Sequence, residues 1–152
     1  MNIEKKLENL GLVLPEAPKP IAEYIPAKKV DNFIFCSGQG PIKNGSFLYV
    51  GRVGDEVSLE EGYESAKLCT LNSLAAIKTV LGTLDDIEEI VKVKGYVNSS
   101  LNFTQQPQVI NGASDLLVKI FGEKGRHSRS ALGTSVLPDN IPVELELIVK
   151  VK

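Results

Sequence analysis

Residues 143–151 read VELELIVKV, in which apolar residues occupy every second position from Val143 to Val151. Because successive side chains of a strand point to opposite faces, these apolar residues would share one face and pack on a core. The other face would carry a mixed set, Glu144, Glu146, Ile148 and Lys150. The pattern predicts a terminal strand with one buried face and one half-charged face.

Further strands are expected upstream. A strand from about residue 129 to 137 is followed by a Pro-Asp-Asn turn, and residues 90–97 also have strand character. Residues 22–30 and 33–37 are expected as two strands joined at Asp31-Asn32, a pair typical of turns. Asn44-Gly45 lies between two short apolar segments and predicts a tight hairpin.

Helical periodicity occupies the remaining segments. A short amphipathic helix is expected over about residues 3–10. Ser58 and Glu61 form a capping box that opens a long helix, and Gly82 closes it. A second long helix is expected from about residue 104 to 121, with an apolar stripe at steps of three and four.

The order of these elements favours an α+β sandwich, with helices on one face of a mostly antiparallel or mixed sheet. The opposite face of the sheet still carries apolar residues such as Ile148. A half-apolar, half-charged face of this kind indicates association between subunits.

Length and composition narrow the function classes. The 152 residues fit one domain, 1–152, with residues 1–20 as an N-terminal helix and proline-containing lead-in and residues 21–152 as the core. A net charge of -2 disfavours a general nucleic-acid binder. No apolar run approaches the roughly 18 residues that span a bilayer, and the charged N-terminus is unlike a signal peptide. We therefore expect a cytoplasmic protein without a membrane segment.

Cysteine and histidine usage disfavours a metal site. Cys36 and Cys69 are not spaced as a disulfide framework or a CxxC motif, and His127 is the single histidine. No metal site is expected, and Cys69 is interpreted as a packing residue of the long helix rather than a nucleophile.

Three groups of residues could carry chemistry. Glu144 and Glu146 project from the same face of a strand, as a general base with its partner or as a solvated sheet face. The loop 37–41 (SGQGP) could bring backbone N–H groups to a ligand or be a plain turn. Residues 125–130 read GRHSRS, where an arginine could bind a carboxylate with two parallel hydrogen bonds or lie in a solvated basic loop. Spacing assigns no serine or aspartate partner to His127, which disfavours a catalytic triad.

Three blocks of sequence resemble one known family. Residues 129–130 (Arg-Ser), 137–138 (Leu-Pro) and 143–146 (Val-Glu-Leu-Glu) match the C-terminal signature of the reactive intermediate deaminase (RidA, YjgF/YER057c/UK114) family. Tyr24 and residues 33–41 (FIFCSGQGP) match its N-terminal tyrosine and its strand ending in SGQ-x-P. The resemblance covers the chain from about residue 20. The N-terminal helix and the GRHSRS loop resemble the branch labelled endoribonuclease L-PSP-like.

This resemblance implies a chorismate mutase-like sandwich, here with an extra N-terminal helix, assembled as a homotrimer with active sites in clefts between neighbouring subunits. It implies hydrolysis of enamines and imines such as 2-aminoacrylate to 2-oxo acids and ammonia, without a cofactor. Arg129 matches the arginine that binds the substrate carboxylate, and Glu144 matches the glutamate that positions or activates the attacking water. Gly38 matches the glycine whose backbone contacts the ligand, and Tyr24 matches the tyrosine that lines the cleft. Ser130 is also expected in the substrate cleft, and Asn102, Arg126 and His127 are expected at its rim.

Two other functions remain open beside a deaminase. The basic residues around His127 are compatible with an endoribonuclease or translation inhibitor, although the net negative charge and the lack of a second histidine count against it. A non-catalytic module that binds a small carboxylate through Arg129 at a subunit interface is the third reading.

Overall fold

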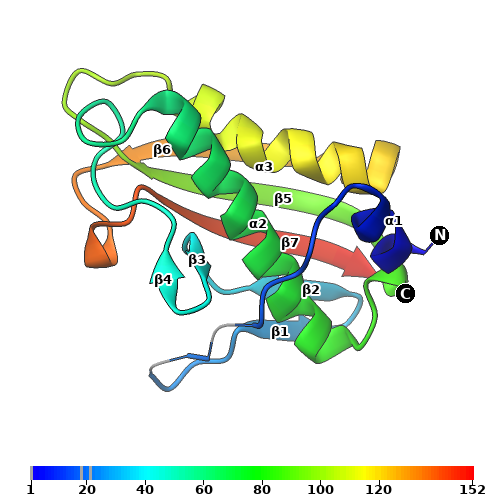
Figure 1. The fold of residues 1–152 in the computed structure, drawn as a ribbon. Coiled ribbons are helices and arrows are strands. Elements are labelled where there is room, and N and C mark those ends of the chain that lie inside the picture. Colours follow the sequence, from blue (N-terminus) through cyan, green and yellow to red (C-terminus); the bar gives the residue numbers. More distant parts are fainter. Residues whose placement is uncertain (1, 18, 21) are drawn as a thin grey trace.

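A computed structural model describes residues 2–17, 19–20 and 22–152 (Figure 1). Met1 and Pro18 of the lead-in, and Ile21 at the expected start of the core, lie outside the described residues. The helices are α1 (Ile3–Asn9), α2 (Leu59–Leu81) and α3 (Gln106–Phe121). The strands are β1 (Ala27–Val30), β2 (Phe33–Cys36), β3 (Ile42–Lys43), β4 (Ser46–Phe47), β5 (Ile87–Asn98), β6 (Ser128–Thr134) and β7 (Val143–Val151). Short 3-10 turns are η1 (Leu84–Asp86), η2 (Gly122–Gly125) and η3 (Pro138–Asn140).

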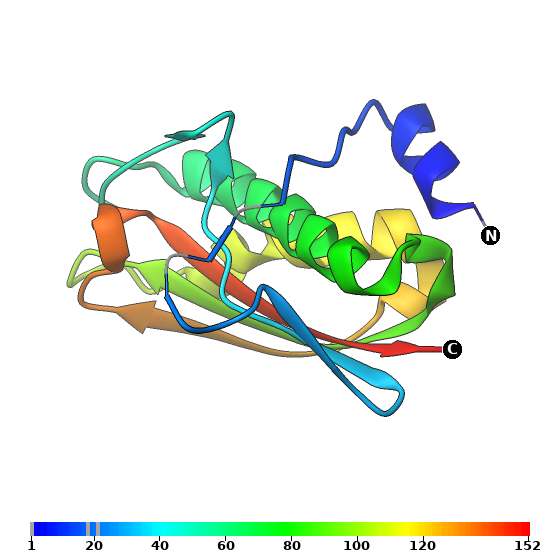
Figure 2. The same cartoon turned by 90° about the horizontal axis from the view of Figure 1, so that it is seen from below.

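The strands form a mixed sheet in the order β1-β2-β7-β5-β6, and β3 pairs with β4 in a separate hairpin. Neighbours in the large sheet are antiparallel except β5 and β6, which run parallel because α3 crosses over between them. Helices α2 and α3 cover one face of the sheet, and its other face is left bare (Figure 2). The expected α+β sandwich with helices on one face is confirmed.

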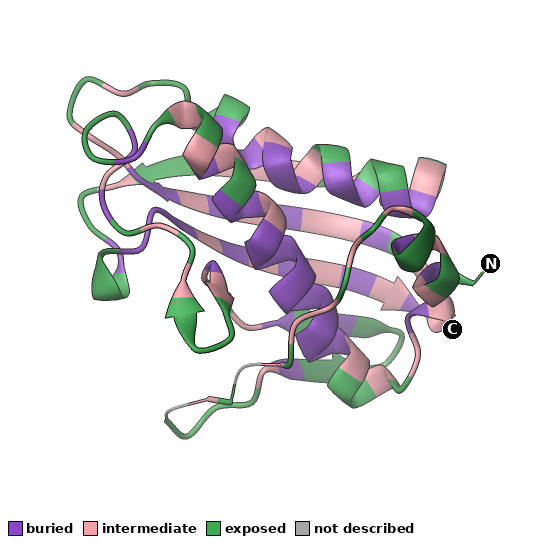
Figure 3. Cartoon of the chain, viewed as in Figure 1, coloured by how far each residue is buried: buried purple, intermediate pink, exposed green. Residues whose placement is uncertain are grey.

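The local signals in the sequence act as expected. Ser58 and Glu61 form the capping box at the start of α2, and Gly82 ends the helix at φ 85°. Asn44 and Gly45 both adopt positive φ in the hairpin turn between β3 and β4. The apolar residues of β7 are buried, and the core they build with α2, α3 and β5 runs along the middle of the fold (Figure 3).

Helix α1 is held on the core by two kinds of contact. Ile3 and Leu7 are buried in the hydrophobic core, and the backbone N–H of Ile3 donates to Asp85 Oδ1 at 2.6 Å. On the surface, Lys78 of α2 forms an ion pair with Glu4 at 2.7 Å. The N-terminal helix therefore packs against α3 and η1 and is linked to α2 by an ion pair, rather than projecting from the body.

Two strands are several residues shorter than expected. The segment 22–30 forms a strand only from Ala27, because Pro26 has no N–H to donate to a neighbouring strand. The strand expected to reach Leu137 ends at Thr134, after which the chain turns into η3. Asp139 and Asn140 adopt φ 56° there, a conformation that aspartate and asparagine tolerate well.

The uncovered face of the sheet is partly apolar. Phe33 and Phe35 are 39% and 47% exposed, and Leu132 lies on the same face at 46%. Burying such side chains between subunits would remove apolar surface from water, so association through this face stays a prediction. In the part of the chain that the structure describes, no helix is long and apolar enough to cross a membrane.

Candidate functional site

Tyr24, Gly38 and Glu144 line one cavity of about 210 Å³. The rest of its wall comes from the N-terminal lead-in, the loop after β2, the β3–β4 hairpin and the η3 region, and includes Lys19, Gln39, Phe47, Asp139 and Ile141. The structure therefore brings together three of the residues expected at the substrate cleft, although they are far apart in the sequence.

Backbone contacts hold the loop after β2 against β7. Gln39 and Leu145 exchange two backbone hydrogen bonds of 2.9 and 3.0 Å, and the Ser37 hydroxyl donates to the carbonyl of Ile25 at 2.6 Å. Gly38 consequently lies directly beside the Glu144 side chain. A Cβ atom at position 38 would be 2.8 Å from Glu144 Oε2, so this approach requires glycine.

The pKa of Glu144 is raised above its usual value, first by partial burial and then by repulsion from Glu146. A carboxylate whose pKa moves toward neutrality can both take a proton from water and return it. Glu144 also contributes to raising the pKa of Cys69, although burial of that thiol is the larger cause. The Cys69 thiol donates to the Val143 carbonyl at 3.5 Å, as expected of a packing residue.

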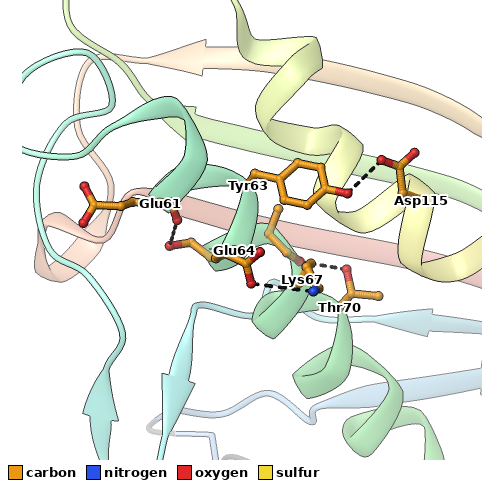
Figure 4. Close-up of polar contacts among 8 residues, drawn as sticks. Glu61, Tyr63, Glu64, Lys67, Thr70 and Asp115 are labelled. Carbon is orange, nitrogen blue, oxygen red and sulfur yellow. Dashed lines mark hydrogen bonds and ion pairs between the residues drawn. The ribbon is translucent and has the colours of Figure 1, made fainter. Parts of the chain in front are cut away.

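Arg129 lies in a different place, in an open groove of about 610 Å³ between α3 and β6. Its Nη1 atom donates to Asn111 Oδ1 at 2.7 Å and to Ser114 Oγ at 3.2 Å. The groove also contains Asp115, whose carboxylate accepts a hydrogen bond from Tyr63 of α2 at 2.8 Å (Figure 4). That bond is the largest of the causes that raise the pKa of Tyr63 to about 12.

His127 lies in the same groove and has a serine partner that sequence spacing did not reveal. Its Nε2 atom is 2.8 Å from Ser114 Oγ, and its Nδ1 atom is 2.6 Å from the carbonyl oxygen of Gly125. Burial is the main cause that lowers the pKa of His127, and Arg129 adds to it. Asn111 and Ser114 are separated from Arg129 by a helix end and a turn, so no local motif links them.

The other expected site residues are spread around these two places. Ser130 pairs with Lys94 across the β5–β6 ladder and points away from the face that Arg129 occupies. Arg126 is exposed at the groove and forms an ion pair with Glu123 at 3.6 Å. Asn102 lies in the exposed turn that follows β5 and lines neither the cavity nor the groove. Within the described residues, no group of three or more His, Cys, Asp or Glu side chains could hold a metal ion.

The register of the sheet separates Arg129 from Glu144. Arg129 pairs with Val93, which is buried under the helices, whereas Glu144 pairs with Tyr96 three residues along β5. Side chains three residues apart on a strand point to opposite faces. Arg129 is therefore on the helix-covered face and Glu144 on the bare face of the same sheet.

A sequence model described as "YjgF/chorismate mutase-like, putative endoribonuclease" matches residues 4–150. The chain belongs to this family. The resemblance and the chorismate mutase-like fold expected from the sequence are thereby confirmed.

Proteins that are similar to this chain carry different names. Protein TCP17 of Trypanosoma cruzi is 36% identical over 149 residues, which cover 97% of this chain and 93% of that protein. The crystal structure of Atu1372 from Agrobacterium tumefaciens, a protein of unknown function, superimposes with a TM-score of 0.92 at 40% identity and covers 99% of this chain and 92% of that one. A 2-iminobutanoate/2-iminopropanoate deaminase of Dermatophagoides farinae is 28% identical over 139 residues, covering 91% and 93% of the two chains.

Proposed function

We propose that this protein hydrolyses 2-imino acids, and the enamines from which they form, to 2-oxo acids and ammonia. The observation that carries the proposal is the half-buried Glu144 carboxylate, which faces the backbone of Gly38 in a cavity of small-metabolite size. The similarity to a deaminase that acts on 2-iminobutanoate and 2-iminopropanoate supports it.

The reaction needs a positively charged group at one end of the substrate and an activated water at the other. Arg129 binds the carboxylate of the substrate, because the guanidinium fork matches the two carboxylate oxygens. Glu144 takes a proton from water as the water oxygen bonds to the C=N carbon, which gives a carbinolamine. The carbinolamine is neutral because the imine nitrogen is protonated at the outset. Glu144 then returns its proton to the nitrogen, the C–N bond breaks with its electron pair on nitrogen, and the hydroxyl proton passes to Glu144 and on to solvent, so that ammonia leaves a 2-oxo acid.

Both groups can serve one substrate if neighbouring subunits share the site. The sheet ends in two different edges: β6, which carries Arg129, and β1, which follows Tyr24. In a closed ring the β6 edge of one subunit lies beside the β1 edge of the next. We propose a homotrimer of this kind, in which Arg129 of one subunit faces the cavity with Glu144 of its neighbour.

The test is the release of 2-oxo acid from 2-aminoacrylate that a serine dehydratase generates in the same cuvette. Wild-type protein should accelerate the release of pyruvate and ammonia, and Arg129→Ala and Glu144→Gln should abolish the acceleration. Lys67→Ala is a matched surface control, since Lys67 pairs with Glu64 on α2. Saturable binding of 2-oxo acids without any acceleration would instead identify a non-catalytic binding module.

An endoribonuclease is the second candidate, because the family description names one and the groove combines His127 with Lys119, Arg126 and Arg129. Its test is degradation of a single-stranded RNA by wild-type protein and by His127→Ala. Cleavage that His127→Ala abolishes would favour this function, whereas cleavage that survives the substitution would come from a contaminant.

A further inference from the structure

The guanidinium of Arg129 is anchored at one corner only. Nη1 carries two N–H groups, and it donates to Asn111 Oδ1 at 2.7 Å and to Ser114 Oγ at 3.2 Å. Within the described residues Nε and Nη2 of Arg129 have no protein partner. The edge that remains, from Nε to Nη2, is one of the two edges through which arginine makes paired hydrogen bonds to a carboxylate.

Ser114 is in turn fixed by His127. A backbone carbonyl only accepts, so the 2.6 Å contact with Gly125 places the proton of His127 on Nδ1. In the neutral ring Nε2 is then an acceptor, and the Ser114 hydroxyl donates to it at 2.8 Å. The hydroxyl oxygen stays available to Arg129, so the bonds run in one direction from the guanidinium to the Gly125 carbonyl.

The hydroxyl of Ser114 behaves unlike other hydroxyls within the helices. Ser65, Thr70 and Ser73 of α2 each donate to the carbonyl four residues earlier, the usual bond for a helical serine or threonine. Ser114 of α3 donates to His127 instead. Its hydroxyl therefore bonds to a residue of the groove instead of to the backbone of its own helix.

The charges around the groove leave the free edge of Arg129 open to an anion. Among the residues that the structure describes, Asp115 is the one carboxylate lining the groove, and its Oδ2 atom accepts a hydrogen bond from Tyr63 of α2. Lys119 and Arg126 also line the groove and add positive charge to it. No ion pair of Arg129 occurs within the described residues.

We propose that Asn111 and Ser114 are positioning residues. They hold the Nη1 corner of Arg129 and so present its Nε–Nη2 edge to the substrate carboxylate, and His127 fixes the orientation of the Ser114 hydroxyl by accepting its hydrogen bond. This inference rests on the proposed function for its substrate class. It predicts that the carboxylate is bound through two hydrogen bonds, from Nε and Nη2. It also explains the histidine two residues before the arginine: His127 orients the hydroxyl that orients Arg129.

The experiment compares Asn111→Ala and Ser114→Ala with wild type in imine hydrolysis and in calorimetric binding of pyruvate, the probe for the carboxylate. We expect KM and the pyruvate Kd to rise about tenfold for each variant, with a smaller change in kcat, since one good charge-assisted bond to the guanidinium is lost in each. Ser114→Thr keeps the hydroxyl and should restore most of the affinity. Thr79→Ala is the matched control, because it removes a helical hydroxyl that donates only to Ala76.

A pH series separates positioning from a purely structural role. Protonation of His127 turns Nε2 into a donor, so the Ser114 hydroxyl loses its acceptor and KM should rise in acid; His127→Gln should lack this rise. The charged groups that share the groove and the adjoining pocket with His127 are Asp115 and Lys119 of α3, Glu89 of β5, Lys150 of β7, Arg126 and Arg129. The variants Asp115→Asn and Glu89→Gln show whether those carboxylates cause the effect instead.

These measurements distinguish a failure of the positioning inference from a failure of the proposed deaminase function. If wild type binds pyruvate but hydrolyses no imine, the deaminase is refuted while the binding series still decides the positioning. If Arg129→Ala abolishes binding while Asn111→Ala and Ser114→Ala, shown to be folded by circular dichroism, bind within twofold of wild type, the positioning proposal is wrong. It is also wrong if wild type neither binds pyruvate nor hydrolyses imines.

Discussion

The side chains of Arg129 and Glu144 project from opposite faces of the same sheet, because the β5 residues with which they pair, Val93 and Tyr96, are three positions apart. The two residues are also separated by about 10 Å along the strands and by two strand spacings of about 4.8 Å. A 2-imino acid is too small to bridge that distance through a sheet. If both residues act on one substrate, they must come from different subunits.

The first prediction is complementation between two inactive variants. Arg129→Ala and Glu144→Gln should each lack imine hydrolysis alone, and co-expression of the two should restore activity. With random mixing in a ring, about a quarter of the interfaces combine an intact arginine with an intact glutamate, so about a quarter of wild-type activity is expected. The measurement is pyruvate release by co-purified oligomers that carry two different affinity tags.

Two controls accompany this experiment. Mixing the purified variants without subunit exchange should restore nothing, and a chain that carries both substitutions should not raise the activity of either single variant. If co-expressed variants form mixed oligomers and stay inactive, the two residues do not combine across a subunit interface.

The second prediction concerns the contact between Gly38 and Glu144. In Gly38→Ala the new methyl group would meet Glu144 Oε2 at 2.8 Å and Cδ at 3.0 Å, so the carboxylate must move. Displacing a general base by a fraction of an ångström to an ångström is expected to lower kcat by about tenfold to a hundredfold. Gly11→Ala is the control for a loss of stability alone: the added methyl group has no neighbour within 4 Å, but the φ of 68° is strained for alanine, so Tm should fall while kcat stays unchanged. Equal kcat values for Gly38→Ala and wild type would contradict a role for this contact.

The sheet and its helices could be predicted because each element carries its own local signal. The alternation in β7, the capping box at Ser58 and the turn at Asn44-Gly45 depend on residues within a few positions of one another. The start of β1 could not be placed in the same way, because the segment from Glu23 to Pro26 also contains residues that favour strands.

The candidate site was predicted only in part, for a related reason. Resemblance to a family placed Tyr24, Gly38 and Glu144 in one cleft, and the structure brings these three together. The partners of Arg129 could not be found, since Asn111 and Ser114 reach it only after α3 packs beside β6. Contacts that depend on tertiary packing leave no spacing pattern in the sequence.

The third prediction is that Glu144→Gln stabilises the protein while it abolishes activity. The native state raises the pKa of Glu144 above 4.5, first through burial and then through Glu146. The ionised carboxylate is therefore more costly in the folded than in the unfolded chain, and this cost develops as the pH rises through the folded pKa. Glu144→Gln should raise Tm by about 1–3 °C at pH 7.5 and leave it unchanged at pH 4, as measured by calorimetry.

The control for this substitution is Glu64→Gln, an exposed glutamate on α2 that pairs with Lys67. Its Tm should change by less than about 1 °C, because exposed ion pairs contribute little to stability. A lower Tm for Glu144→Gln than for wild type at pH 7.5 would mean that the Glu144 carboxylate is stabilising, against the direction of its pKa.

The last prediction is a loss of stability in acid that depends on His127. Burial lowers the pKa of His127 below 6.5 in the folded protein. As the pH falls below 6.5, the unfolded chain takes up the proton first, so the native state loses stability until the pH has passed below the folded pKa. His127→Gln cannot take up this proton. Between pH 7.5 and pH 5, the Tm of wild type should therefore fall by about 1–3 °C more than the Tm of His127→Gln. If the difference in Tm between the two proteins does not vary with pH, His127 titrates alike in the folded and the unfolded chain.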